Sequence, residues 1–193
     1  MSSDMSFNHH KKVEAEIEKI ILDSDIPEDY AHALDVREWV LKFKPDADWA
    51  LRFAAFAHDV ERALPERKVR RSDFLDYDSF KKAHAKNSAR IVDEIFSTYP
   101  IDQSEKEKIL RLIEYHEIGP DQDPELVFLR DADSLSFFKL NLSLYAQRHS
   151  EEEVLFRMKW GFQRLSEKGK KMLKDFHYED EKLSKYLKLV INS

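Results

Sequence analysis

The sequence predicts an all-α protein, and three observations carry that prediction. Apolar residues recur at helical intervals of three, four and seven positions along nearly the whole chain. Alternating polar and apolar runs of the kind that strands show are scarce. Only three glycines occur in 193 residues, so the glycine-rich phosphate loops of nucleotide-binding α/β folds are absent. No composition shift marks a boundary, so we expect one domain over residues 1–193.

Apolar spacing and prolines place the first three helices. The first is expected from about residue 9 to 23, where the apolar residues lie at helical spacing, namely Val13, Ile17, Ile20 and Ile21. The second should start at Pro27 and run to about Phe43, because proline is favoured in the first helical turn. The third begins after Pro45 and is expected to end near Pro65, since proline disfavours helix at the residue before it.

Capping residues place the next two helices. Asp78 or Ser79 can cap a fourth helix that runs to about residue 99. Ser104 and Glu107 form a capping-box pattern for a fifth helix, which should stop near the Gly-Pro pair at 119–120.

The remaining helices begin at Pro124 and after Ser150. The helix that Pro124 opens should continue through about Ala146, and Ser150 with Glu153 gives a second capping-box pattern. A last short helix carries apolar side chains at helical spacing, namely Leu183, Tyr186, Leu187 and Val190. The pattern therefore predicts about seven to eight helices.

Composition and charge limit the classes of function. A chain that is 42% hydrophobic and 36% charged is typical of a soluble globular protein. Its apolar runs fall far short of the roughly 20 residues that span a bilayer, and its start lacks the apolar core of a signal peptide. We therefore expect a cytoplasmic protein that does not associate with membranes. A net charge of -6 argues against general nucleic-acid binding, and the basic segment 62–71 is interpreted as a solvated loop.

Four of the eight histidines share helical stripes with apolar residues and should face the core: His32, His58, His84 and His116. The chain has no cysteine, so a metal would have to be held by histidine, carboxylate, carbonyl or water. A single histidine on an apolar face is more often a hydrogen-bonded core residue. Four buried imidazoles each need a partner, because an unpaired buried polar group costs about 1–3 kcal/mol. If the four converge, one bound cation would satisfy them together.

Charged residues also interrupt an apolar helix in the segment "FLRDADSLSFF", residues 128–138. Arg130, Asp131 and Asp133 would be strongly disfavoured there without partners. The two aspartates lie about 200° apart around a helix, so only one is expected to reach a given metal. Both faces of this helix are apolar, so the spacing does not select between them.

Taken together, His32 in "DYAHALDV", the pair His58-Asp59 in "FAHDVERA" and Asp133 in "RDADSLSFF" follow the order of the HD-domain superfamily of metal-dependent phosphohydrolases. The chain resembles this all-α family over about residues 28–145. The resemblance implies an HD-domain-like helical bundle that hydrolyses a phosphate ester at a divalent metal. The additional C-terminal helices, at about 150–190, lie outside it.

The resemblance also implies which residues bind the metal. The family's last aspartate stands in an "ADxL"-like context, which favours Asp133 over Asp131. The implied ligands are His32, His58, Asp59 and Asp133. Some branches have two further histidines that hold a second metal, and His84 in "KKAHAKNSARI" and His116 in "YHEIGP" occupy those positions. In single-metal members the equivalent histidines contact phosphate or assist proton transfer, so both roles stay open here.

The chain departs from the family after the doublet. Several nucleotide-hydrolysing branches have a catalytic glutamate three residues after the aspartate, where this chain has Arg62, with Glu61 one residue earlier. The long glycine-proline signature of the cyclic-dinucleotide phosphodiesterases is matched only briefly. The resemblance therefore does not assign a substrate.

The expected activity is hydrolysis of a nucleotide or another small phosphorylated metabolite, as a phosphomonoesterase or phosphodiesterase. Imidazole and carboxylate ligands suit one or two ions of Mn, Fe, Co, Ni or Zn. Asp59, His84 and His116 are the candidate catalytic residues. Three basic residues are candidates for binding the substrate phosphate: Arg62, Lys81 and Arg130. Arg130 has an alternative role, an ion pair with Asp131.

Two other interpretations compete with this one. Some proteins with the same fold and ligand order are di-iron oxygenases. A non-catalytic regulatory or binding domain, in which the metal only holds helices together, is the second. The sequence is compatible with a homo-oligomer.

Overall fold

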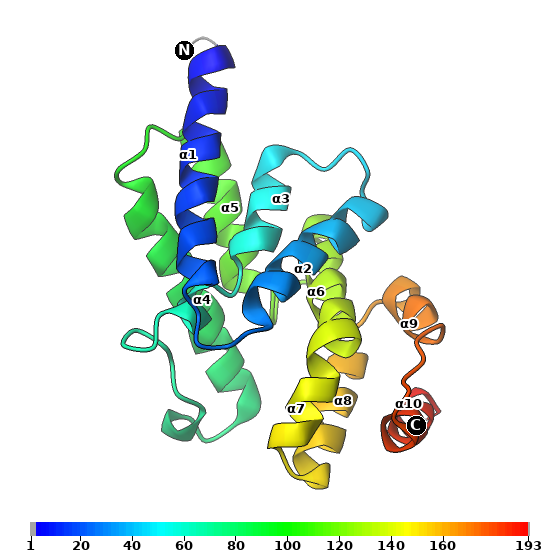
Figure 1. The fold of residues 1–193 in the computed structure, drawn as a ribbon. Helices are drawn as coiled ribbons and strands as arrows, with labels where there is room; N and C mark the ends of the chain where they lie inside the picture. The colour runs from blue at the N-terminus through cyan, green and yellow to red at the C-terminus, as the bar shows by residue number, and fades with distance from the viewer. Residues whose placement is uncertain (1–2, 193) are drawn as a thin grey trace.

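A computed structural model describes residues 3–192, and within that range its regular secondary structure is all helical, without strands (Figure 1). The prediction of an all-α fold is therefore confirmed. The α-helices are α1 (Ser3–Leu22), α2 (Asp29–Phe43), α3 (Trp49–Ala57), α4 (Tyr77–Phe96), α5 (Gln103–Tyr115), α6 (Pro124–Ser136), α7 (Leu142–Arg148), α8 (Glu151–Gln163), α9 (Glu167–Leu173) and α10 (Glu181–Ile191).

In the described residues the helices are more numerous than the expected seven to eight. The segment expected as one helix over residues 124–146 contains a π-helical turn, Phe137–Asn141, between α6 and α7. The short helix α9 was not expected separately. None of the helices in residues 3–192 is long and apolar enough to cross a membrane.

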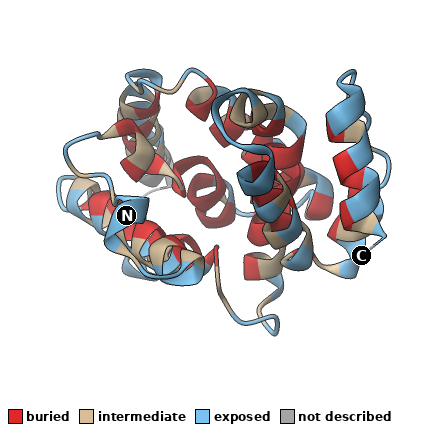
Figure 2. Cartoon of the chain, turned by 90° about the horizontal axis from the view of Figure 1, so that it is seen from below, coloured by how far each residue is buried: buried red, intermediate tan, exposed pale blue. Residues whose placement is uncertain are grey.

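The centre of the molecule is α3, whose side chains are almost all buried. It packs against α2 and α5, while α2 also packs on α6 and α4 packs on α5. Ala54, Ala55 and Ala57 are fully buried, and small side chains let neighbouring helices approach closely. Figure 2 shows the buried residues gathered on the inner faces of the helices, with exposed residues outside. This packing brings the ends of several helices to one place.

The end of α3 differs from the sequence prediction. The helix stops at Ala57 rather than near Pro65, and a short 3-10 turn, Val60–Ala63, follows. Asp59 leaves helical geometry, with φ -106° and ψ 17°. Pro65 lies eight residues beyond the last residue of α3, so the proline does not set the end of this helix. As a result His58 and Asp59 lie in the turn after α3.

Asp76 caps α4 in place of the expected Asp78 or Ser79, and Asp102 caps α5 in place of the expected Ser104. Asp76 accepts a hydrogen bond from the backbone N–H of Ser79 and caps α4. Asp102 accepts from the backbone N–H of Ser104 and caps α5. In both cases the carboxylate also accepts from the serine hydroxyl, which removes the serine as a cap. The capping box of Ser150 at the start of α8 is confirmed.

The C-terminal helices pack on the side of α6 and α7 that lies away from α1 (Figure 1). Helix α8 packs against α7 and α10, and α9 packs against α6. One cluster of buried apolar side chains extends from Val13 in α1 to Val190 in α10. The helices beyond about residue 150 therefore share a core with the rest.

Candidate metal centre

Seven side chains that can bind a metal converge in two buried clusters. Within each cluster the potential ligand atoms lie within 4.8 Å of one another. The histidine-rich cluster, cluster A, consists of His32, His58 and Asp133. The second cluster, cluster B, consists of Asp59, His84, His116 and Glu117. The prediction that four histidines face the core is confirmed, since each is at most 4% exposed.

Cluster A draws its residues from three elements. His32 lies in α2, His58 follows α3, and Asp133 lies in α6. The Nε2 atom of His32 is 3.2 Å from Asp133 Oδ1, and His58 Nε2 is 3.6 Å from the same oxygen. The neighbouring Asp131 turns the other way and accepts hydrogen bonds from the backbone and hydroxyl of Ser166. The structure therefore places Asp133, and not Asp131, beside the histidines.

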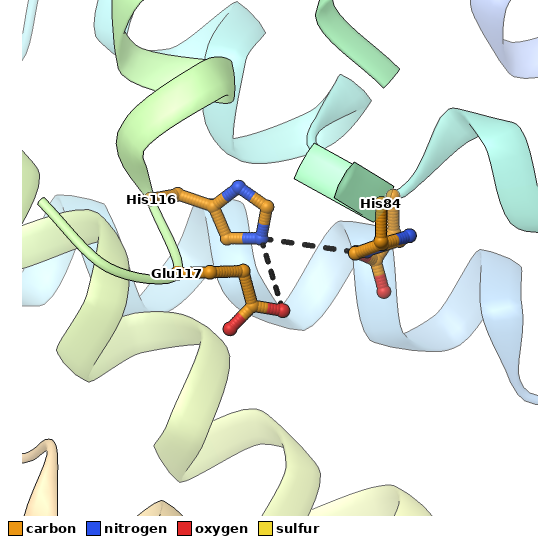
Figure 3. A group of neighbouring side chains, drawn as sticks. His84, His116 and Glu117 are labelled. Atoms are coloured by element: carbon orange, nitrogen blue, oxygen red, sulfur yellow. Dashed lines mark hydrogen bonds and ion pairs between the residues drawn. The ribbon is translucent and has the colours of Figure 1, made fainter. Parts of the chain in front are cut away.

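Cluster B joins the ends of α3 and α5 to the middle of α4. His84 Nε2 is 2.7 Å from Asp59 Oδ1, and His116 Nε2 is 3.9 Å from the same atom. The Glu117 carboxylate lies 3.5 Å from His116 Nε2, and Figure 3 shows it turned toward the His116 ring. Glu117 was not among the residues expected from the sequence. Its signal was available, because Glu117 follows His116 as Asp59 follows His58.

Asp59 lies between the two clusters. Its Oδ1 atom is 3.6 Å from His58 Nε2 of cluster A, in addition to its contacts with His84 and His116. One carboxylate oxygen thus faces three imidazoles. Burial would raise the pKa of Asp59, but the positive charges of His58 and His84 hold it well below its usual range.

All four histidines are anchored through Nδ1 and turn Nε2 toward the clusters. His58 and His116 donate from Nδ1 to the backbone carbonyl three residues earlier, at 2.9 and 2.7 Å. His32 Nδ1 lies 3.0 Å from the hydroxyl of Ser136, and His84 Nδ1 donates to Glu61 at 2.7 Å. Such hydrogen bonds set the ring orientation and are typical of histidines that bind metals.

Two of the Nε2 atoms, those of His58 and His116, are buried without a hydrogen-bond partner among the described residues. A buried polar atom without a partner is costly. These atoms lie beside carboxylates, so a divalent cation between them would satisfy both. Imidazole nitrogens and carboxylate oxygens are also ligands that Zn and the neighbouring divalent transition metals accept. The residues present therefore fit a metal ion.

The electrostatic environments of these two histidines are opposite. Burial lowers the pKa of His58, but Asp59 and Asp133 overcome that effect and raise it to about 9. For His116, burial prevails over the attraction of Glu117, so its pKa is lowered. The first histidine therefore holds a proton at neutral pH unless a metal replaces it.

Two cations hold Glu117. Lys81 of α4 forms an ion pair with Oε1, and Arg164, just after α8, lies 2.5 Å from Oε2. Arg164 also reaches Asp133 Oδ2 at 3.0 Å and therefore connects the carboxylates of both clusters. Burial opposes ionisation of Glu117, but these charges hold its pKa well below the usual range. The position of Arg164 depends on how α8 packs, so helical spacing did not indicate it.

The expected phosphate-binding residues are placed differently from one another. Arg62 lies 2.9 Å from Asp29 and 3.6 Å from Asp59, at the edge of the centre. Lys81 contacts cluster B through Glu117. Arg130 instead pairs with Asp121 and donates to the carbonyl of Gly119. The alternative role expected for Arg130 was an ion pair with Asp131. That prediction was wrong, because the guanidinium turns toward the loop before α6.

Glu61 supports cluster B through its hydrogen bond with His84. It is 1% exposed, accepts the Nδ1 hydrogen bond of His84, and also accepts from Asn87 and from the backbone of Val69. These contacts use the carboxylate to hold His84 and the segment after the 3-10 turn. Glu61 is therefore a positioning residue.

A family model described as "Domain of unknown function (DUF4202)" matches residues 6–185, a range that includes both clusters. No curated protein and no solved structure matches the chain.

Proposed function

We propose that this chain, which belongs to the DUF4202 family, is a metal-dependent phosphohydrolase with two divalent ions, one at each cluster. The observation that carries the proposal is the position of Asp59, whose Oδ1 atom faces histidines of both clusters. A carboxylate placed in this way would be within reach of an ion held at either cluster. The order of the ligands along the chain supports a phosphate ester of a small metabolite as substrate.

Bound divalent ions would supply Lewis acidity, polarising a phosphoryl oxygen and lowering the pKa of water. The chain's own residues supply the rest. The Nδ1 hydrogen bonds direct the four Nε2 atoms toward the centre. The low pKa values of Asp59, Asp133 and Glu117 keep these carboxylates ionised at neutral pH, as metal binding requires.

Metal analysis joined to an activity screen tests the proposal. The protein would be purified without a histidine tag, supplemented with each of Mn, Fe, Co, Ni and Zn, and freed of unbound metal. Elemental analysis should find close to two ions per chain. A panel of nucleotides and sugar phosphates should then show release of inorganic phosphate or of a phosphomonoester.

Asp59→Asn and Asp131→Asn form a matched pair of controls. Both remove the charge of a largely buried aspartate, but only Asp59 faces the clusters. Asp59→Asn should lose metal and turnover, while Asp131→Asn should keep both. Absence of divalent metal above background after supplementation would overturn the proposal. Bound iron with oxygen uptake and no phosphate release would favour an oxygenase instead.

A further inference from the structure

Three cationic side chains surround one indole ring beside the candidate metal centre. The Nζ atom of Lys81 lies 5.9 Å from the centroid of the Trp160 ring. The guanidinium carbons of Arg157 and Arg164 lie 4.9 and 4.6 Å from it. Trp160 lies in α8 and is anchored to α4 by a hydrogen bond, in which its Nε1 donates to Asp78 at 2.9 Å. Arg157 in α8 therefore shares its neighbourhood with the two cations that hold Glu117.

Arg157 differs from these two cations because its charge is not paired. Lys81 and Arg164 both form ion pairs with Glu117. Among the described residues Arg157 forms no ion pair, and its NH1 atom is buried without a hydrogen-bond partner. The residue is only 7% exposed, and its guanidinium lies 4.0 Å from the centroid of the Phe137 ring. Burying a charge without a counterion is costly, so an anion is the partner that this position lacks.

The charges of the metal centre reach Arg157. Burial lowers its pKa, but Tyr77 and then Asp133 and Glu117 outweigh burial and raise it. Arg157 is therefore charged, and carboxylates of both clusters act on it electrostatically without forming an ion pair with it among the described residues. The residue four positions later is Gly161, where an added Cβ would lie 3.3 Å from NH1. The absence of a side chain there leaves the guanidinium uncrowded on that side.

We propose that Arg157 binds a phosphate oxyanion at the edge of the metal centre. The guanidinium matches phosphate oxygens with two parallel N–H donors. This inference rests on the proposed function and deepens it, because it assigns the substrate's phosphate to a residue on α8. The phosphate-binding residues expected from the sequence already have carboxylate partners, since Arg62, Lys81 and Arg130 pair with Asp29, Glu117 and Asp121.

Binding of inorganic phosphate, measured by calorimetry on the full chain, tests this inference without turnover. Arg157→Gln should weaken phosphate binding by about tenfold or more, because a charge-assisted bidentate contact is lost. Arg130→Gln is the matched control: Arg130 is also buried, at 9% exposed, but already pairs with Asp121. Its phosphate affinity should stay within about twofold of the original chain.

Arg157→Lys keeps the charge and loses the two-donor geometry, so it should weaken phosphate binding about threefold to tenfold. This variant also decides the matter if Arg157→Gln does not fold. Three results would each overturn the inference. They are an unchanged phosphate affinity in a folded Arg157 variant, an equal loss of affinity in the Arg130 variant, and no phosphate binding by the original chain.

The outcome is separable from that of the proposed function. The titration is run on chelator-treated and on metal-supplemented protein. Arg157-dependent phosphate binding by a chain that holds no metal and hydrolyses no ester would sustain this inference and overturn the proposed function. Metal-dependent hydrolysis, together with phosphate binding that is unchanged in the Arg157 variants, would sustain the proposed function and overturn this inference.

Discussion

Two histidine-carboxylate doublets occupy the same local position in this molecule. His58-Asp59 follows the last residue of α3, and His116-Glu117 follows the last residue of α5. Each histidine donates from Nδ1 to the carbonyl three residues earlier and leaves a buried Nε2 without a hydrogen-bond partner. Backbone and ring geometry are thus repeated at two helix ends.

Their carboxylates nevertheless have different surroundings. Asp59 faces three imidazoles, whereas Glu117 is held by Lys81 and Arg164. The histidine pKa values differ accordingly, raised to about 9 for His58 and lowered for His116. The comparison teaches that a helix end aims the histidine, while residues from other helices decide the charge that it meets.

The largest effect is expected from Asp59→Asn. Because Asp59 contacts both clusters, its loss should lower metal affinity at both by more than about 100-fold, beyond what loss of a supporting residue causes. Metal content by elemental analysis would measure this. If one ion remained bound with unchanged affinity, Asp59 would serve a single cluster and the contrast between the doublets would fail.

The histidines should also give the chelator-treated protein opposite pH dependences. The raised pKa of His58 means that the folded state binds more protons between pH 6.5 and 9. The free energy of unfolding should therefore fall by about 3 kcal/mol as pH rises through that window. Burial lowers the pKa of His116, so its contribution should weaken the fold as pH falls below 6.5.

Urea unfolding at a series of pH values measures both slopes. His58→Gln should reduce the alkaline slope, to which His84 with its raised pKa also contributes, and leave the acidic one. His116→Gln should reduce the acidic slope and leave the alkaline one. Metal affinity should rise over the alkaline window, because the metal must displace the proton of His58. Equal slopes in the two variants would contradict the assignment.

Glu117→Gln should have a smaller effect, confined to cluster B. Its two cationic neighbours already neutralise Glu117, so its loss should lower the affinity of one ion by about 10-fold to 100-fold. Competition with a chelator of known affinity would measure the two ions separately. A loss at both clusters, as large as for Asp59→Asn, would show that the doublets are equivalent.

The smallest effect is expected outside the doublets, at Asp131. This carboxylate accepts from Ser166 at the start of α9, so Asp131→Ala should cost about 1–2 kcal/mol of stability through loss of the cap contact. Metal content should not change. Loss of metal in this variant, with metal retained in Asp133→Ala, would exchange the roles of the two aspartates.

Periodicity was reliable within the helices, whereas capping and proline signals were weaker at placing the helix ends. The burial of His32, His58, His84 and His116 followed from helical stripes alone, because a stripe of apolar neighbours defines one face. Helical stripes did not predict the end of α3, because Ala57 is followed by seven residues whose types also suit a helix. There the contacts of the turn with α1 and α4 determine where the chain leaves the helix.

The sequence by itself determined the all-α class and the inward face of four histidines, and a family resemblance singled out His32, His58, Asp59 and Asp133. The resemblance also favoured Asp133 over Asp131, a choice that helical spacing left open. Only the tertiary structure decided that Glu117 completes the second cluster, and that Arg164 and Arg157 lie beside it. The reason is physical. Helical spacing specifies which face a residue occupies, whereas the charge that faces it comes from another helix, whose position is set by packing across the core.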